Sequence, residues 1–211
     1  MATDTGFEVA ELKAFHLSLS DQPGYWEDYR GGGSKSQRQD RLEFRKGWQT
    51  VYPTTVEAVL VRVTFTDGSI GWGESNSPIG PEVTALICER LLAPMVKGRS
   101  FDTPAALWDF LYDAQRGRGY AAGYYLDALA ALDIAAWDAI GCRAGLPVAQ
   151  LLTQTPRTHL PVYLSGLRQA TVEERIDAMR RWVDTGLKGI KIFVDGDLDA
   201  AGRELETLQQ A

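Results

Sequence analysis

The segment Val59–Ser75, VLVRVTFTDGSIGWGES, has the pattern of two antiparallel strands joined by a tight turn. Residues 56–65 alternate, placing valines and a phenylalanine on one face, as in a strand with one buried side. Asp67 and Gly68 are the residue types that a tight hairpin turn favours, and apolar residues continue into the return strand. A looser alternation over residues 7–19 predicts an earlier strand. We therefore expect an antiparallel sheet of about three strands.

The stretch between the first two expected strands, residues 24–48, has a different composition. It contains three consecutive glycines, Gly31 to Gly33, and many charged residues. Such a segment supplies little apolar surface for a packed core, and therefore predicts a long mobile loop. Loops of this length often act as lids over functional sites.

Helical spacing of apolar residues begins after the hairpin. It predicts helices over residues 83–96, 104–114 and 124–142. The third is apolar on more than one face, so we expect it to be buried on several sides and to form the spine of its domain. Gly145 has the position of a C-terminal cap, and Pro147 suits the start of a short helix.

The last part of the chain alternates between strand and helix. Strands are predicted over residues 160–165 and 187–194, and helices over 171–184 and 197–210. Capping signals support the helices: Thr171 with Glu174 forms a capping box, Gly186 suits a left-handed ending, and Asp197 can cap the final helix. Leu198, Ala201, Leu205 and Leu208 would form the apolar stripe of that helix.

Two strands make a poor parallel sheet, because such sheets normally bury both faces and need further neighbours. The expected fold class is therefore an α+β domain, an antiparallel sheet plus helices over residues 1–155, followed by an incomplete β/α barrel over residues 156–211. The missing strands would come from a longer chain or from a second chain.

Charge and hydropathy exclude several classes of function. A net charge of −6 disfavours non-specific binding to nucleic acid or to an anionic membrane surface. There is no apolar run near the roughly 20 residues of a membrane span, and the first residues lack a signal-peptide layout. We expect a cytoplasmic protein, for which chemistry on a small molecule remains open.

The cysteines and histidines do not predict a metal or nucleophilic centre. Cys88 and Cys142 are far apart and lie in helical segments, so both are expected to be buried, reduced thiols. His16 and His159 are the two histidines, and each stands alone in a strand-like run. A zinc site or a Ser-His-Asp site is therefore not expected.

Several motifs taken in this order resemble the N-terminal half of an enolase-superfamily enzyme of the mandelate racemase and muconate lactonizing type. They are Gly71-Trp72-Gly73-Glu74, Leu132-Asp133-Ile134-Ala135-Ala136-Trp137-Asp138, Gly145-Leu146-Pro147, VYLSG at 162–166 and GLKGIKIF at 186–193. The resemblance covers essentially the whole chain. It implies a capping domain that closes over a modified β/α barrel, and metal-dependent abstraction of a proton next to a carboxylate.

In that family a Lys-x-Lys pattern lies on the second barrel strand, and the resemblance makes Lys191 the catalytic lysine. Phe193 stands where the second lysine is often found and would contact substrate instead. Because a phenyl ring cannot accept a proton, one-base dehydration of an acid sugar becomes the favoured reaction. A racemase, epimerase or cycloisomerase is the alternative. Alternation places Lys191 on one face of the expected strand and Ile190 and Ile192 on the other face. An exposed lysine on a sheet edge would have the same pattern.

The resemblance also implies a substrate-binding set. Tyr25 and Trp26 fall in the expected lid, Trp48 and Tyr52 fall near a second loop that can line the pocket, and Ser165 ends the first barrel strand. Ordinary aromatic packing under a loop would explain Trp48 and Tyr52 equally well.

The cofactor implied is Mg²⁺, with carboxylate ligands on later barrel strands, beyond Ala211. Asp195, Asp197 and Asp199 lie at a turn and a helix start, where capping accounts for at least one of them, so they are not expected to bind Mg²⁺. We expect a small carboxylate or acid-sugar substrate, a homo-oligomer, and no activity from these residues alone. The other hypothesis is a non-catalytic remnant that binds a partner through its open sheet edge.

Overall fold

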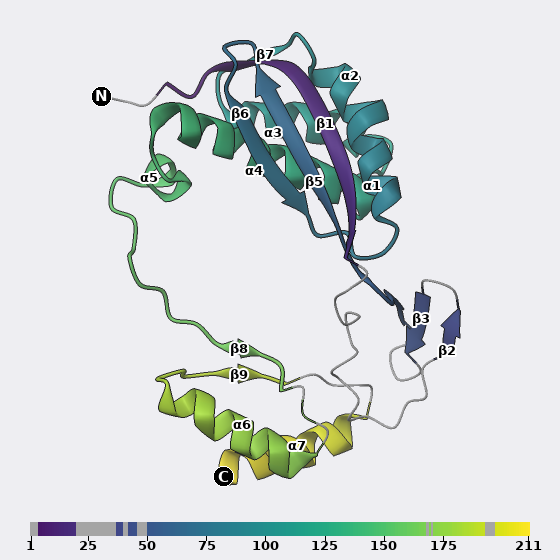
Figure 1. The fold of residues 1–211 in the computed structure, drawn as a ribbon, viewed down its shortest axis with the longest axis vertical. Coiled ribbons are helices and arrows are strands. Elements are labelled where there is room, and N and C mark those ends of the chain that lie inside the picture. The colour runs from purple at the N-terminus through teal and green to yellow at the C-terminus, as the bar shows by residue number, and fades with distance from the viewer. Residues whose placement is uncertain are drawn as a thin grey trace. The chain divides into compact units, whose positions relative to one another are not determined.

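The computed structural model describes residues 4–19, 37–39, 42–45, 50–167, 169, 171–192 and 197–211 (Figure 1). The chain divides into two compact units. The first comprises Met1–Leu19 with Glu57–Pro156, and the second comprises Ser20–Val56 with Arg157–Ala211. Each unit has its own cluster of buried apolar side chains.

The first unit contains a four-stranded sheet with the order β6-β5-β1-β7. Its strands are β1 (Phe7–Leu19), β5 (Val56–Phe65), β6 (Ile70–Ser75) and β7 (Ser100–Phe101). β5 and β6 form the expected antiparallel hairpin, with Val61 opposite Gly73 and with Gly68 at φ 88 in the turn. The expected sheet is confirmed. The two-residue β7, which pairs antiparallel with β1, is too short to leave a periodic signal.

One face of this sheet packs against helices. They are α1 (Pro81–Ile87), a π-helical turn η1 (Cys88–Leu92), α2 (Ala93–Val96), α3 (Pro104–Arg116), α4 (Tyr124–Ala144) and α5 (Val148–Leu152). Figure 1 shows α3 and α4 behind the sheet. Val59, Val61 and Val63 on β5 are completely buried, as their alternation predicts. α4 ends at Gly145, which has a left-handed φ of 64, and α5 follows Pro147 as expected.

β6 and α4 are joined by a hydrogen bond as well as by packing. The backbone N–H of Trp72 donates to Oδ2 of Asp138, at 2.9 Å. At the C-terminal end of α4, Arg143 donates to Asp67 in the hairpin turn, at 3.0 Å, and to the carbonyl of Gly6, at 2.9 Å. The segments that carry GWGE and LDIAAWD therefore form one packing unit.

α4 has the burial expected of a domain spine, since side chains on several of its faces are buried. Cys88 is completely buried, and burial raises its pKa to about 12. The expectation for Cys142 was wrong, because this thiol is exposed. It lies in the last turn of α4, beyond Ala139, which is the last α4 residue in close approach to Gly71.

The second unit contains a small antiparallel sheet within the stretch expected to be a loop. Its strands are β2 (Gln37–Gln39), β3 (Leu42–Arg45) and β4 (Thr50–Pro53), in the order β2-β3-β4. The loop interpretation of residues 24–48 was therefore wrong for β2 and β3. Short strands of mixed polarity can be held by backbone pairing, which composition does not reveal. The glycine run at Gly31 to Gly33 lies outside the described residues.

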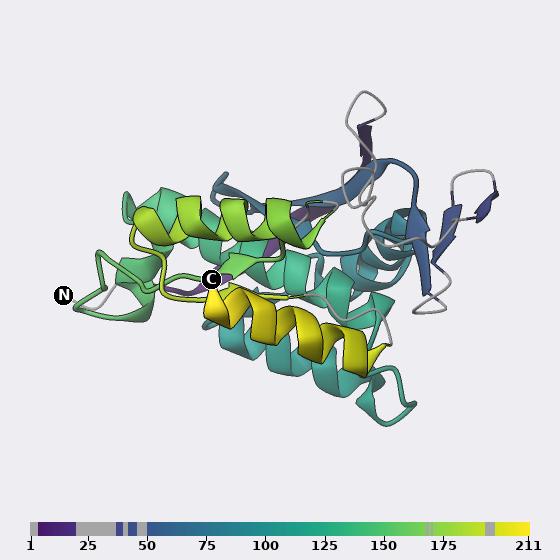
Figure 2. The same ribbon diagram turned by 90° about the horizontal axis from the view of Figure 1, so that it is seen from below.

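The remainder of the second unit is a strand-helix-strand-helix segment. It contains β8 (Leu164–Ser165), α6 (Val172–Asp184), β9 (Ile190–Lys191) and α7 (Leu198–Gln210), with β8 and β9 parallel. Figures 1 and 2 both show α6 and α7 on the same side of the two strands. The capping box of α6 and the Asp197 cap of α7 are confirmed. Both strands are shorter than expected, because within the described residues each pairs only with the other.

The core between these strands and helices is small. Leu167, Ala178 and Leu208 are buried, and Leu164, Ile176, Met179, Ile190 and Ile192 pack against them. Arg175 on α6 forms an ion pair with Glu204 on α7, at 2.6 Å. Leu198 was wrongly assigned to the apolar stripe of α7, since it is 76% exposed.

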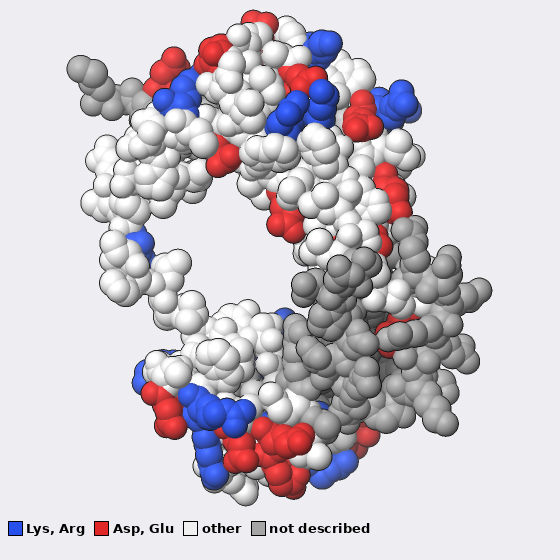
Figure 3. All heavy atoms as spheres, viewed as in Figure 1, with Lys and Arg blue, Asp and Glu red and all other residues white. Residues whose placement is uncertain are grey.

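The surface of the second unit carries mixed charge. Figure 3 shows basic and acidic side chains next to one another over α6 and α7, with no extended patch of a single sign in that view. Within the described ranges, no helix has the length and apolar character needed to cross a membrane.

Candidate functional site

The candidate site lies where β8 and β9 end. Ser165 stands opposite Lys191 in the parallel register of these strands. The pairing is held by hydrogen bonds from the N–H of Leu164 to the carbonyl of Gly189, at 3.0 Å, and from the N–H of Gly166 to the carbonyl of Lys191, at 2.9 Å. The C-terminal ends of parallel strands are the edge at which β/α barrels carry their sites.

The two faces of this strand pair differ in chemistry. Leu164, Ile190 and Ile192 pack on the core formed with α6 and α7. Ser165 and Lys191 alternate with them and are exposed. Because successive side chains of a strand point to opposite faces, the hydroxyl and the ammonium both lie on the face away from the helices. The expected alternation around Lys191 is therefore present, while its catalytic role stays a prediction.

A cavity of about 300 Å³ adjoins Ser165. Its lining comes from Leu164, Ser165, Gly166, Leu167, Gln169 and Trp182. Oε1 of Gln169 is buried and has no hydrogen-bond donor in the part of the chain that the structure describes. An acceptor buried in this way is costly unless a ligand, water or a further segment supplies a donor. Sequence reasoning missed Gln169, because a single glutamine between a strand and a helix has no motif around it.

Arg175 holds the segment that contains Gln169. Its Nε donates to the carbonyl of Gln169, at 2.8 Å, and its Nη1 donates to Oε1 of Glu204, at 2.6 Å. The guanidinium therefore joins the segment after β8 to both α6 and α7. Such charge-assisted bonds are stronger than neutral ones, so Arg175 fixes the position of Gln169.

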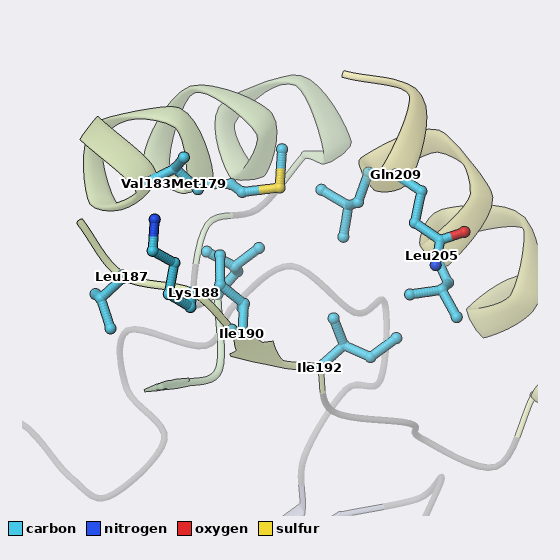
Figure 4. Close-up of a pocket in the computed structure, with 11 residues that line it drawn as sticks. Met179, Val183, Leu187, Lys188, Ile190, Ile192, Leu205 and Gln209 are labelled. Carbon is cyan, nitrogen blue, oxygen red and sulfur yellow. The ribbon is translucent and has the colours of Figure 1, made fainter. Parts of the chain in front are cut away.

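A second cavity, of about 510 Å³, lies next to the face of β9 that carries Ile190 and Ile192. Figure 4 shows Met179, Val183, Leu205, Ile190 and Ile192 around it, between α6, α7 and the strand. These side chains are apolar, and Ile190 and Ile192 belong to the face opposite Lys191. The cavity is therefore an open part of the helix–sheet core and does not suit a polar, charged substrate.

The other expected substrate-binding residues are only partly visible. Tyr52 lies on β4, opposite Glu43, and is half-buried. Tyr25, Trp26, Trp48 and Phe193 lie outside the described residues. The structure thus brings together two members of the expected set, Ser165 and Lys191.

No Mg²⁺ site is formed near β8 and β9 by the described residues. Asp197 accepts a hydrogen bond from the N–H of Ala200, at 2.8 Å, and so caps α7 as expected. Within the described ranges, one group of His, Cys, Asp and Glu side chains lies close enough together to hold a metal ion, and it belongs to the first unit. The residues present beside Lys191 therefore do not fit a magnesium centre, whose carboxylate ligands would have to come from elsewhere.

Comparison with known proteins gives the family. Residues 40–153 match the N-terminal domain of mandelate racemase / muconate lactonizing enzyme. A D-galactonate dehydratase family member of Paenibacillus sp. (strain JDR-2) is 32% identical over 138 residues, which is 65% of this chain and 33% of the relative. D-mannonate dehydratase of Caulobacter vibrioides is 32% identical over 135 residues, or 64% of this chain and 32% of that enzyme.

A solved structure extends the similarity to nearly all of the chain. A member of the enolase superfamily from Agrobacterium tumefaciens is 36% identical, with a TM-score of 0.84, over 97% of this chain and 52% of that one. The fold is therefore that of an enolase-superfamily N-terminal part. The chain belongs to the mandelate racemase / muconate lactonizing enzyme family. It spans about a third of the length of these two curated relatives and about half of the solved chain.

Proposed function

We propose that this chain is the N-terminal part of a Mg²⁺-dependent acid-sugar dehydratase. The observation that carries the proposal is the pairing of Ser165 with Lys191 at the C-terminal ends of two parallel strands, on the face away from the helices. The names of the two dehydratase relatives support the choice of reaction.

The chemistry requires a positive charge beside the substrate. A proton is removed from the carbon next to the carboxylate, the neighbouring hydroxyl leaves as water, and the resulting enol becomes a ketone. Charge accumulates on the carboxylate as the proton leaves, and an ammonium group at that point stabilises it. Mg²⁺ would supply further stabilisation of the same charge. In this scheme Lys191 contacts the carboxylate, and Ser165 and Gln169 orient hydroxyl groups.

The test is substitution of Lys191 in the full-length enzyme that contains this segment. Lys191→Met should lower kcat for an acid sugar by at least about 100-fold, as expected for loss of one electrostatic or proton-transfer group. Lys188→Met is the matched control, because Lys188 precedes the strand and lines the apolar cavity on the opposite side. Full activity of Lys191→Met with an equally folded protein would refute the assignment.

A cycloisomerase or racemase is the second candidate, because the family name includes a racemase and a lactonizing enzyme. The product that the enzyme forms distinguishes dehydration from racemisation. Dehydration gives a keto acid and water, whereas racemisation incorporates solvent deuterium at the α-carbon without loss of a hydroxyl group. Lysine-dependent racemisation in the full-length enzyme would argue against the dehydratase.

A further inference from the structure

A further cavity lies within the first unit, between η1, the end of α3 and the start of α4. Its volume is about 480 Å³, and its lining comes from Ile87, Leu91, Gln115, Arg118, Tyr120 and Tyr125. All of these residues belong to the first unit, so the cavity is separate from the strand ends of β8 and β9. Its size falls within the range of about 300 to 1,000 Å³ that is typical of small-molecule sites.

Three side chains give this cavity an apolar lining. Ile87 precedes η1 and Leu91 lies within it, and both pack on the core of the first unit. Tyr125 on α4 is buried, and its hydroxyl donates to the carbonyl of Leu111 on α3, so its polar group is already satisfied. A lining of this kind suits an apolar body. The π-helical turn itself is a rare element that is found frequently at functional sites.

The segment after α3 places two further side chains at the cavity. The carbonyl of Gln115 accepts the backbone N–H of Arg118, at 3.0 Å, and that of Tyr120, at 3.3 Å. Gly119 between them has a φ of 84, in the left-handed region that glycine adopts without strain. The end of α3 therefore folds this segment back and fixes Arg118 and Tyr120 beside the apolar lining.

Arg118 supplies a positive charge at the cavity. Within the described ranges its guanidinium group has no ion-pair or hydrogen-bond partner, whereas Arg116, two residues earlier, pairs with Asp113 at 2.9 Å. A guanidinium group can donate two parallel N–H bonds to one carboxylate. An apolar cavity with a guanidinium group beside it is complementary to a ligand that has an apolar body and one carboxylate.

We propose that this cavity binds a small aryl or alkyl carboxylate, with its apolar body against Leu91 and Tyr125 and its carboxylate on Arg118. Tyr120, whose side chain is 62% exposed, covers the bound ligand. An acid sugar does not suit this cavity, because its hydroxyl groups would lose their hydrogen bonds to water against an apolar lining. The site therefore takes a different class of anion from the substrate proposed for the site at Lys191.

The experiment is titration of the ¹⁵N-labelled 211-residue chain with 3-phenylpropionate, followed by the amide signals in NMR spectra. A parallel titration uses 3-phenylpropan-1-ol, which has the same apolar body without the charge. We expect saturable shifts at Leu91, Gln115 and Tyr120, with a Kd for the acid of about 1 mM or lower. The alcohol should bind about 10-fold more weakly, because it lacks the charge-assisted bonds to Arg118.

Variants separate the charge from the apolar lining. Arg118→Gln should weaken binding of the acid by about 10-fold and leave binding of the alcohol unchanged. Arg116→Gln is the matched control, because it removes the same charge from a residue that pairs with Asp113 and does not line the cavity. Tyr120→Ala should weaken binding of acid and alcohol alike, by about 5-fold, since it removes apolar contact area. All three changes are at exposed positions, so the variants should fold.

Several outcomes would overturn the proposal. They are shifts that do not saturate, equal affinity for acid and alcohol, equal loss in Arg118→Gln and Arg116→Gln, and shifts confined to Met179 and Ile190, which line the cavity of the second unit. Sedimentation of the chain without ligand gives a further check. Self-association that Tyr120→Ala abolishes would make the cavity a contact between copies of the chain, whereas a profile that Tyr120→Ala leaves unchanged agrees with a carboxylate site.

Discussion

Gly73 lies so close to the backbone of Ala131 that a Cβ atom on Gly73 would overlap the carbonyl oxygen of that alanine. Gly71 has the same relation to the carbonyl oxygen of Ala135, one helical turn further along α4. Strand β6 therefore rests directly on the backbone of a helix. The glycines of GWGE contact Ala135, which lies within LDIAAWD, and the alanines that flank this motif, Ala131 and Ala139, so the two motifs meet in one contact.

Gly73→Ala should destabilise the first unit by more than about 3 kcal/mol, because neither backbone can move without breaking the sheet or the helix. Gly117→Ala is the control, since a Cβ at that position meets open space and the backbone has an ordinary φ of −64. Urea denaturation of the two variants measures the difference. Equal midpoints would show that β6 and α4 are not in close contact.

Asp133 should make stability depend on pH. Burial raises the pKa of its carboxyl group from 3.8 to about 6. The folded chain holds a proton that the unfolded chain releases between these values, so this group makes the free energy of unfolding fall as pH rises from 3.8 to about 6.

Asp133→Asn should therefore raise stability at pH 7 by about 1 kcal/mol, a figure reduced for partial exposure to solvent, and should remove the slope. Urea denaturation at a series of pH values measures both effects. Asp109→Asn, at an exposed position on α3, should leave the slope unchanged. An unaltered slope in Asp133→Asn would assign the pH dependence to another group.

Ser77 is the centre of a buried hydroxyl network. Its Oγ lies 2.8 Å from the hydroxyls of Ser75 and Thr84, and donates to Oδ2 of Asp127 at 3.2 Å. Ser77→Ala removes a hydrogen-bond partner from Ser75, Thr84 and Asp127. The variant should lower the free energy of unfolding by about 1 to 3 kcal/mol. Ser100→Ala, at an exposed hydroxyl, should change stability little. Thermal unfolding of the pair gives the comparison, and equal Tm values would contradict the network.

Arg175 should control the segment that contains Gln169. Arg175→Met removes both the bond to the Gln169 carbonyl and the ion pair with Glu204, at a cost of about 1 to 3 kcal/mol. Amide hydrogen exchange in the peptide after β8 should become faster. Arg203→Met, an exposed arginine on α7, is the matched control. Unchanged exchange in Arg175→Met would mean that other contacts hold Gln169 in place.

Local pattern predicted much of the fold. The alternation along β5, the helical spacing of α4 and the capping box at Thr171 each depend on residues a few positions apart, and each is confirmed. The errors arose where that information is weak. β3 is a short paired strand within a charged stretch, where composition indicates a loop. Cys142 lies one turn beyond the part of α4 that packs against β6, and its thiol is therefore exposed.

The candidate sites divide in the same way. The alternation of Ile190, Lys191 and Ile192 was readable from sequence, because side-chain direction in a strand follows a period of two. The pairing of Lys191 with Ser165 depends on the register of two strands, which only the tertiary structure gives. Gln169, whose buried oxygen lacks a donor within the described ranges, left no local signal.

The sequence by itself determined the β5–β6 hairpin, the long helices, the family resemblance and the face of β9 on which Lys191 lies. Only the tertiary structure decided that His16, which stands alone in the sequence, meets Glu57 and Glu82. The physical reason is the range of each effect. Periodicity and capping act within one or two turns of the chain, whereas a cluster contributed by β1, β5 and α1 exists only after sheet pairing and helix packing have placed distant residues together.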